Sequence, residues 1–296
     1  MSETADTTPG DATTSGRAVV LVLGSKGMLG TACLRTFGHE AVGCDLDDFD
    51  IADSSAARAA IARLQPRLIV NCAAATDVDR CELDHEYADR ANALGPKNVA
   101  QAAAEVGARL VHVSTDFVFA GDKGRPYAET DTPDPVNHYG RSKLEGERGA
   151  LTALPDALIV RTSWLYGHGG KHFPGNVIKW AAGGGPLRIV DDQVGSPTYA
   201  EDLAAAIRAL AERTATGLFH LGGTGCASRF EWASETVALA DLGVQVLPAS
   251  SSEFPLPAPR PANTCLDCSK AAGLGVRLPP WRDGLARYIG SRQGAC

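Results

Sequence analysis

Long apolar runs are missing from this sequence. Its 296 residues contain no stretch of roughly 18 consecutive apolar residues, so no membrane-spanning helix is expected. Positive charge is also scarce, because 28 lysines and arginines stand against 35 aspartates and glutamates and give a net charge of −7. An acidic chain of this kind binds nucleic acids and anionic membranes poorly. We therefore expect a protein that binds neither nucleic acid nor membrane.

The signatures of export and of zinc binding are absent as well. Residues 1–17 are small, polar and acidic, without the features of a signal peptide, and we interpret them as a disordered tail. Of the eight cysteines, only Cys265 and Cys268 form a C-x-x-C pair, and no second pair or histidine couple completes a zinc site. We expect reduced thiols in a cytoplasmic protein, and no bound metal.

Short β-branched runs alternate with helical stretches through the first half of the chain. Such alternation is typical of a parallel sheet covered by helices on both faces. The sequence therefore predicts an α/β protein with a Rossmann-like doubly wound parallel sheet. The strands are expected at 17–24, 40–45, 67–74, 109–116 and 157–164, and the helices at 28–37, 54–65 and 86–107, the last ending at Gly107.

The alternation loosens after residue 164. Glycine-rich segments follow at 167–175 and 181–186, and a proline-rich segment at 254–262 is incompatible with regular helix. Chemistry tends to lie on loops of this kind above a rigid sheet. We therefore expect a dinucleotide-binding Rossmann domain at 18–164, to which the chain later returns, and a smaller, mainly substrate-binding C-terminal lobe at 165–296.

The first expected strand ends in a glycine-rich turn. Gly24, Gly27 and Gly30 form a G-x-x-G-x-x-G pattern that leads into a helix. Glycines at these positions let the backbone approach a pyrophosphate, and the helix N-terminus supplies N–H donors. The pattern predicts a dinucleotide site at this turn.

Two nearby charges favour different dinucleotides. Asp45 follows the turn by about 20 residues at the end of the second strand, where a carboxylate can accept hydrogen bonds from the adenosine ribose and favour NADH. Lys26 lies inside the turn, where a cation can pair with a 2′-phosphate and favour NADPH. The alternative for Asp45, with Asp47 and Asp48 after it, is a solvated acidic turn. Both NADH and NADPH therefore stay open as the cofactor.

A tyrosine and a lysine lie four residues apart in HYGRSK, residues 138–143. On a helix Tyr139 and Lys143 share one face, although the spacing also arises by chance. Thr115 and Asp116 end the fourth strand, at the sheet edge where ligands bind. Tyrosine can protonate a ketone oxygen that accepts hydride, the lysine cation would lower the tyrosine pKa, and Thr115 can hydrogen-bond the same oxygen. These residues predict a ketone-reducing site.

Longer motifs carry a resemblance to one family. They are NCAAATDVDRCE (71–82), STDFVFAG (114–121), YGRSK (139–143), RTSWLYG (161–167), DDQVGSPT (191–198) and RPANTCLDCSK (260–270). Through them the chain resembles the dTDP-4-dehydrorhamnose reductase family, part of the extended short-chain dehydrogenase/reductase superfamily. The resemblance implies NAD(P)H-dependent reduction of the 4-keto group of a dTDP-4-keto-6-deoxysugar, with dTDP-4-dehydro-L-rhamnose as the foremost substrate.

The resemblance also implies roles for individual residues. Thr115, Tyr139 and Lys143 match the family's catalytic residues, with Lys143 also at the nicotinamide ribose. Trp164 and Arg260 fall in motifs associated with the nucleotide sugar, beside Thr115 and Asp116; core packing and a surface position are the alternatives for Trp164 and Arg260. An arginine between prolines suits a diphosphate clamp. Besides Tyr139 and Lys143, the expected cofactor contacts are Gly24, Lys26, Gly27, Met28, Leu29, Gly30, Asp45, Asn71, Ala73 and Ala74.

The chain departs from the family pattern at three places. Phe117 replaces a usual tyrosine, Ala32 replaces a glutamate that bridges metal-linked dimers in some members, and 170–175 differs at the start of its loop. These changes argue against a metal and leave the sugar and the choice between monomer and homodimer open. The alternatives are a 4-ketoreductase for another dTDP-deoxysugar, a nucleotide-sugar epimerase with tightly held NAD, and a non-catalytic nucleotide-binding regulatory subunit.

Overall fold

Six parallel strands form the central sheet of the computed structural model, which describes residues 20–293; the tail expected at 1–17 lies outside this range. In space they follow the order β10-β5-β4-β3-β1-β2, and each neighbouring pair is parallel. The expected Rossmann-like sheet is therefore confirmed. Its strands are β1 (Val20–Leu23), β2 (Ala41–Cys44), β3 (Leu68–Asn71), β4 (Arg109–Thr115), β5 (Leu158–Thr162) and β10 (Gly217–His220).

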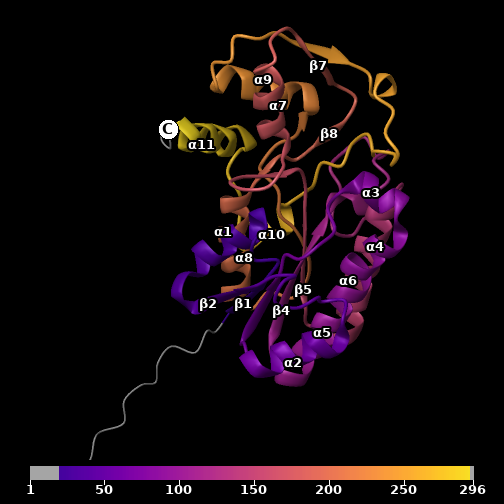
Figure 1. Cartoon of the computed structure of the whole chain (residues 1–296), viewed down its shortest axis with the longest axis vertical. Helices are drawn as coiled ribbons and strands as arrows, with labels where there is room; N and C mark the ends of the chain where they lie inside the picture. Colours follow the sequence, from indigo (N-terminus) through magenta and orange to yellow (C-terminus); the bar gives the residue numbers. More distant parts are fainter. Residues whose placement is uncertain (1–19, 294–296) are drawn as a thin grey trace, which may run out of the picture.

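The near-continuous apolar character of the strands follows from burial on both faces of the sheet. In β1, Val20 and Val22 belong to a core shared with α1 (Met28–Phe37) and α8 (Ala200–Glu212). The alternate residues Leu21 and Leu23 belong to a second core on the opposite face. That core is covered by α2 (Ser54–Leu64), α5 (Gly95–Val106) and α6 (His138–Ala153), as Figure 1 shows.

The sheet has a topological switch point between β1 and β3. After β2 the chain crosses over β1 and continues on its other side with β3, β4 and β5. Crossovers on opposite sides leave a crevice at the carboxyl ends of β1 and β3, which is where doubly wound sheets bind ligands. The fold therefore predicts a ligand site at this edge of the sheet.

The expected helix at 86–107 is interrupted rather than regular. It consists of α4 (His85–Asp89), a π-helical turn at Arg90–Leu94, and α5, and it ends at Gly107 as predicted. Pro96 has no N–H to donate, so the run cannot keep regular hydrogen bonds through this point. The turn instead buries Asn92, whose side chain bonds both the N–H of Ala75 at 2.9 Å and its carbonyl at 3.0 Å.

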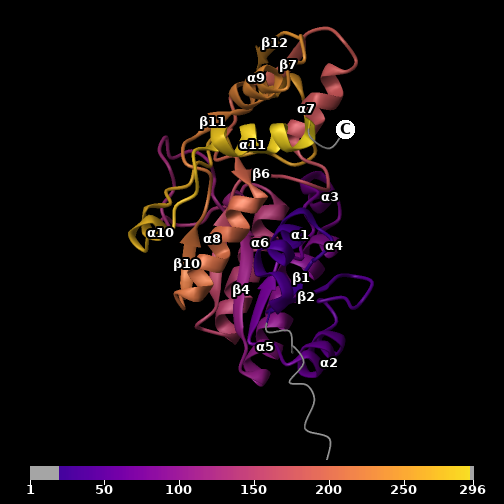
Figure 2. The same ribbon diagram turned by 90° about the vertical axis from the view of Figure 1, so that its left-hand side faces the viewer.

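The remaining elements form a smaller lobe above the carboxyl edge of the sheet (Figures 1 and 2). Its aromatic cluster includes Tyr166, Trp232, Trp281 and Tyr288. No helix within residues 20–293 combines the length and the apolar character that a membrane crossing requires. The lobe contains β6 (Leu165–Tyr166), α7 (Phe173–Ala181), β7 (Leu187–Val190), β8 (Val194–Gly195), β9 (Thr198–Tyr199), β11 (Ala227–Ser228), α9 (Arg229–Leu239), β12 (Val246–Ala249) and α11 (Trp281–Gln293); α3 (Val78–Leu83) and α10 (Ser269–Gly273) flank the sheet.

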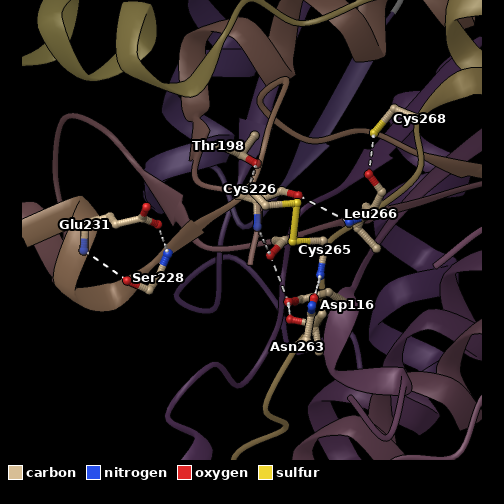
Figure 3. The surroundings of a disulfide bond; sticks show 12 residues. Asp116, Thr198, Cys226, Ser228, Glu231, Asn263, Cys265, Leu266 and Cys268 are labelled. Carbon is tan, nitrogen blue, oxygen red and sulfur yellow. Dashed lines mark hydrogen bonds between the residues drawn. A yellow bond between two sulfur atoms is a disulfide. The ribbon is translucent and has the colours of Figure 1, made fainter. Parts of the chain in front are cut away.

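Cys226 and Cys265 form a disulfide bond (Figure 3). The prediction that the cysteines are reduced thiols is therefore wrong for this pair. The loop after β10 runs beside the segment that precedes α10, which brings the two Cα atoms to 5.9 Å although 39 residues separate them. The C-x-x-C spacing drew attention to Cys268, but Cys268 is free and the partner of Cys265 comes from a distant segment.

Candidate active site

The glycine turn lies too close to its neighbours for any side chain at two of its positions. Gly24 has a φ of +70°, and a Cβ added there would lie 2.7 Å from the backbone nitrogen of Ala73 after β3. A Cβ on Gly30 would lie 2.1 Å from the carbonyl oxygen of Gly24. Only glycine fits both positions, so the N-terminus of α1 at Met28 is held beside the ends of β1 and β3.

A cavity of about 280 Å³ lies at the carboxyl ends of β1, β2 and β3. Five of the predicted cofactor contacts line it, namely Gly24, Gly27, Asp45, Ala73 and Ala74. The others flank it: Met28, Leu29 and Gly30 form the first turn of α1, and Lys26 faces solvent. Asn71 is buried beneath it, where its side-chain oxygen accepts the Ala73 N–H at 3.1 Å and fixes the backbone that forms the cavity wall.

The two charges that favour different dinucleotides are placed differently. The Asp45 carboxylate lines the cavity and accepts the backbone N–H groups of Lys26 and Leu46, each at 2.8 Å. The Lys26 ammonium instead forms an ion pair with Asp47 on the surface, and the hydrogen bond from that pairing raises the Lys26 pKa. The lysine charge is thus already matched by the Asp47 carboxylate, whereas Asp45 lines the cavity.

The start of α6 places Tyr139 beside the end of β4. Asn137 caps the helix by accepting the Gly140 N–H at 2.8 Å, and its amide donates to the Pro259 carbonyl at 2.9 Å. A Cβ on Gly140 would lie 2.1 Å from the Phe117 carbonyl oxygen, so the first turn of α6 rests directly on the turn that follows Thr115. The glycine after Tyr139 therefore allows the close approach of the two segments.

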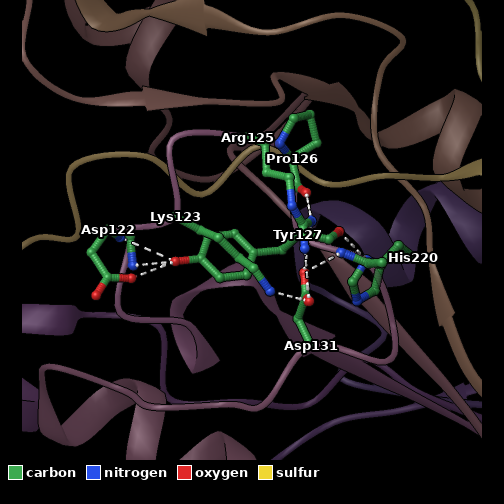
Figure 4. A network of polar contacts seen from close by, with 9 residues as sticks. Asp122, Lys123, Arg125, Pro126, Tyr127, Asp131 and His220 are labelled. Atoms are coloured by element: carbon green, nitrogen blue, oxygen red, sulfur yellow. Dashed lines mark hydrogen bonds and ion pairs between the residues drawn. The ribbon is translucent and has the colours of Figure 1, made fainter.

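The segment between β4 and α6 is held by its own polar contacts (Figure 4). The Tyr127 hydroxyl accepts the backbone N–H groups of Gly121 at 3.0 Å and Asp122 at 3.1 Å. The Asp131 carboxylate pairs with Lys123 and Arg125. This bonding stabilises the middle of the segment that connects Thr115 to Tyr139.

The acidity of the tyrosine differs from the expectation. Burial raises the pKa of Tyr139 far above its usual value, and hydrogen bonding by Thr115 offsets only part of this rise. The Lys143 Nζ donates to the Val113 carbonyl at 2.7 Å, and the lowering of the Tyr139 pKa by its charge stays a prediction. Burial lowers the pKa of Lys143 itself to about 8, against the opposing charge of Glu147.

Glu147 is a site neighbour that the sequence reasoning missed. It lies one further turn along α6 from Lys143 and makes a buried ion pair with Arg161, with the Arg161 nitrogens at 2.8 Å and 2.6 Å from its oxygens. The Ser114 hydroxyl donates to the same carboxylate at 2.5 Å. The spacing of four residues after Lys143 was the available signal, because it puts Tyr139, Lys143 and Glu147 on one helix face.

Asp116 is enclosed by hydroxyl groups. Its carboxylate accepts Ser163 at 2.8 Å and Thr264 at 2.5 Å on one oxygen, and Thr115 at 3.0 Å on the other. Burial raises the Asp116 pKa, and the three hydrogen bonds oppose that rise. The carboxylate of Asp116, an expected substrate contact, is thus oriented toward Thr115 and toward Thr264, which precedes Cys265 of the disulfide. Asp116 lies below that disulfide in Figure 3.

Trp164 and Arg260 lie on the lobe side of this network. Trp164 has a φ of +47°, a strained conformation for a bulky residue, and its ring lies against Gly195, where a Cβ would come within 2.5 Å of it. The Arg260 side chain is only 17% exposed and pairs with Asp79 at 3.0 Å, so it is no free surface cation. Their contact with a nucleotide sugar stays a prediction.

Comparisons with known proteins agree on one family. The model of the RmlD substrate binding domain matches residues 18–293. A dTDP-4-dehydrorhamnose reductase of Mycobacterium tuberculosis (strain ATCC 25618 / H37Rv) is 43% identical over 287 residues, covering 93% of this chain and 94% of the relative. A probable dTDP-4,6-dihydroxy-2-methyloxan-3-one 4-ketoreductase of Streptomyces antibioticus is 39% identical over 277 residues, covering 90% and 92%. The crystal structure of a Bacillus anthracis dTDP-4-dehydrorhamnose reductase in complex with NADP has a TM-score of 0.89 at 36% identity, covering 92% and 98%.

Proposed function

Since the chain belongs to the dTDP-4-dehydrorhamnose reductase family, we propose that it reduces the 4-keto group of dTDP-4-dehydro-L-rhamnose to give dTDP-L-rhamnose, with NADH or NADPH as the hydride donor. One observation carries the proposal: Thr115 and Tyr139 lie together at the carboxyl end of β4, with Lys143 one turn away, on the same sheet edge as the glycine turn. This arrangement suits a carbonyl oxygen that gains negative charge while hydride reaches its carbon.

The residues at the glycine turn fit a nicotinamide dinucleotide. Gly24 and Gly30 leave the backbone bare where a Cβ would collide, and the N-terminus of α1 offers N–H donors to phosphate oxygens. Asn71 holds the opposite wall through Ala73. The bound cofactor supplies the hydride.

The side chains of the site supply and place the proton. Because burial raises the pKa of Tyr139, its phenol keeps its proton near neutral pH and can donate it to the substrate oxygen. The Thr115 hydroxyl is oriented by Asp116 and can donate a second hydrogen bond when it turns to the same oxygen. Lys143 is suited to bind the nicotinamide ribose with its ammonium.

The cellular setting and the assembly belong to the proposal as well. We place the enzyme in the cytoplasm, as a monomer or homodimer that needs no metal ion. Ala32, in place of the family's bridging glutamate, supports the proposal that no metal ion is needed. Disulfides are uncommon in a reducing compartment, so the Cys226–Cys265 bond argues against the cytoplasmic location. We assign the lobe above the sheet to substrate binding.

The reaction is tested directly with a panel of dTDP-4-keto-6-deoxysugars. With NADH or NADPH present, the absorbance of the reduced nicotinamide should fall, and the product should be identified by its C4 configuration. Net loss of reduced cofactor only with another sugar of the panel would favour the second candidate, a 4-ketoreductase for that sugar, which the Streptomyces antibioticus relative supports. No net loss with any sugar would refute a reductase and leave the epimerase or the regulatory subunit.

For the cofactor we expect a preference for NADH that depends on Asp45. Its carboxylate faces the cavity and would repel a 2′-phosphate, whereas Lys26 is already paired with Asp47. Asp45→Asn keeps an acceptor oxygen but removes the charge. The ratio of kcat/KM for NADH to that for NADPH should therefore fall roughly 5- to 10-fold, the effect of about 1 kcal/mol of charge repulsion.

Steady-state kinetics with both cofactors measure this ratio. Asp156→Asn is the matched control, because Asp156 is an exposed aspartate in the turn before β5, at the other end of the sheet. The control should keep the parent ratio. An unchanged ratio in Asp45→Asn would show that Asp45 belongs to a solvated turn and does not select the cofactor.

A further inference from the structure

Arg229, the first residue of α9, carries a half-buried guanidinium that has no polar partner among residues 20–293. Its Cζ lies 3.6 Å from the centroid of the Trp164 ring, and the Phe173 ring is 5.0 Å away. Its backbone N–H donates to the Gln193 carbonyl at 3.1 Å. Within residues 20–293 the guanidinium itself has neither a hydrogen bond nor an ion pair, so its planar fork of N–H donors is free.

The surroundings of this arginine are positively charged. It lines a cavity of about 400 Å³ between the start of α7, the start of α9 and the proline-rich segment. Lys171 and Arg260 line the same cavity, and in the part of the chain that the structure describes no aspartate or glutamate does. Burial lowers the Arg229 pKa to about 9; the charge of Asp116 opposes this effect and that of Arg260 adds to it. An anion in the cavity would therefore favour the charged form of Arg229. Of its two arginines, Arg260 already pairs with Asp79, which leaves Arg229 as the unpaired one.

The cavity adjoins the network around Thr115. Trp164, on which Arg229 stacks, directly follows Ser163, and the Ser163 hydroxyl donates to Asp116 at 2.8 Å. Asp116 in turn accepts the Thr115 hydroxyl, and its charge is felt at Arg229. A chain of neighbouring residues therefore joins the cavity at Arg229 to the Thr115 hydroxyl.

We propose that the Arg229 guanidinium, held flat by Trp164, binds the diphosphate of a nucleoside diphosphate sugar in this cavity. Arginine suits phosphate because its planar fork matches two oxygens at once, and stacking on an indole fixes the fork with little further loss of freedom. The inference rests on the proposed function for the identity of the sugar nucleotide. It assigns the diphosphate to Arg229 in addition to the predicted Arg260.

Binding of dTDP, dTMP and thymidine, measured by calorimetry, tests the assignment without any hydride transfer. Arg229→Gln should weaken dTDP binding roughly 10- to 100-fold, as expected for the loss of charge-assisted hydrogen bonds, and should leave thymidine binding near the parent value. Arg229→Lys keeps the charge but loses the fork and should weaken dTDP several-fold. In turnover, KM for the nucleotide sugar should rise more than kcat falls.

Arg282→Gln is the matched control, because Arg282 also stacks on a tryptophan of the lobe, 4.3 Å from the Trp281 ring, but pairs with Glu235 and lies outside the cavity. It should bind dTDP like the parent. Unchanged dTDP affinity in Arg229→Gln would overturn the assignment, and if that variant does not fold, unchanged affinity in Arg229→Lys would do so. Arg229-dependent dTDP binding without reduction of any keto sugar would refute the reductase and leave this inference standing.

Discussion

Tyr139→Phe is expected to leave cofactor binding nearly intact and to lower turnover by roughly 10²- to 10⁴-fold, the usual contribution of a general acid. The substitution keeps the ring, which lies edge-on to Phe117 with 5.8 Å between the ring centroids, so the start of α6 should stay in place. Only the proton donor next to Thr115 disappears. Because burial keeps the Tyr139 pKa high, the lost group is the protonated phenol over the whole neutral range.

Single-turnover reduction and cofactor titration measure the two effects separately. Tyr199→Phe is the control, because it also removes a tyrosine hydroxyl but does so away from the site. Tyr199 lies in the aromatic packing of the lobe, with 5.6 Å between its ring centroid and that of Tyr166. It should reduce the keto sugar at the parent rate. If Tyr139→Phe also does so, the proton comes from another group and the site at the end of β4 is misassigned.

The sheet was predictable because its physical cause is local. A strand buried on both faces must be apolar along its whole length, and β1 and β3 are buried throughout. The glycine turn was equally legible, since Gly24 and Gly30 stand where the backbone admits no side chain. The end of the interrupted helix at Gly107 was also predictable from the sequence, but the π-helical turn before Pro96 was not.

Contacts between distant segments could not be predicted from the sequence, because their cause is not local. The Cys226–Cys265 bond depends on two loops that meet only in the folded lobe. The same holds for Thr264, which reaches Asp116 from 148 residues away. A single sequence shows the residue types but not which loops become neighbours, so these partners carried no signal.

Tyr139 and Lys143, the predicted catalytic pair, were only partly predictable. Their helical spacing correctly placed Tyr139 and Lys143 on α6, but spacing says nothing about burial. The structure shows burial to be the main influence on the pKa of both residues, upward for the phenol and downward for the amine. Burial acts in this way because taking either charge out of water is costly, and the spacing of the two residues carries no information on that cost.

Lys143→Met is expected to weaken cofactor binding roughly 10- to 100-fold and to lower turnover as well, because the ammonium is assigned to the nicotinamide ribose and a charged donor is worth a few kcal/mol. The pH dependence distinguishes this role. The folded Lys143 pKa of about 8 lies below that of an unfolded lysine, so the amine loses its proton as pH rises through about 8. Cofactor affinity of the parent should therefore fall above that pH, and affinity of Lys143→Met should be low and flat.

The stability of the folded parent should rise with pH above about 8, where its cofactor affinity falls. This difference distinguishes a functional loss from misfolding. A lysine whose pKa is lowered by folding destabilises the protein while it is charged, and this penalty is fully present below about pH 8 and fades as pH rises toward 10.5. Methionine has a similar length and no charge to bury, so the melting temperature of Lys143→Met near neutral pH should not fall much. Tyr139→Phe should keep the parent pH profile of cofactor affinity. If Lys143→Met binds the cofactor like the parent, with the same fall above pH 8, the ammonium does not contact the ribose.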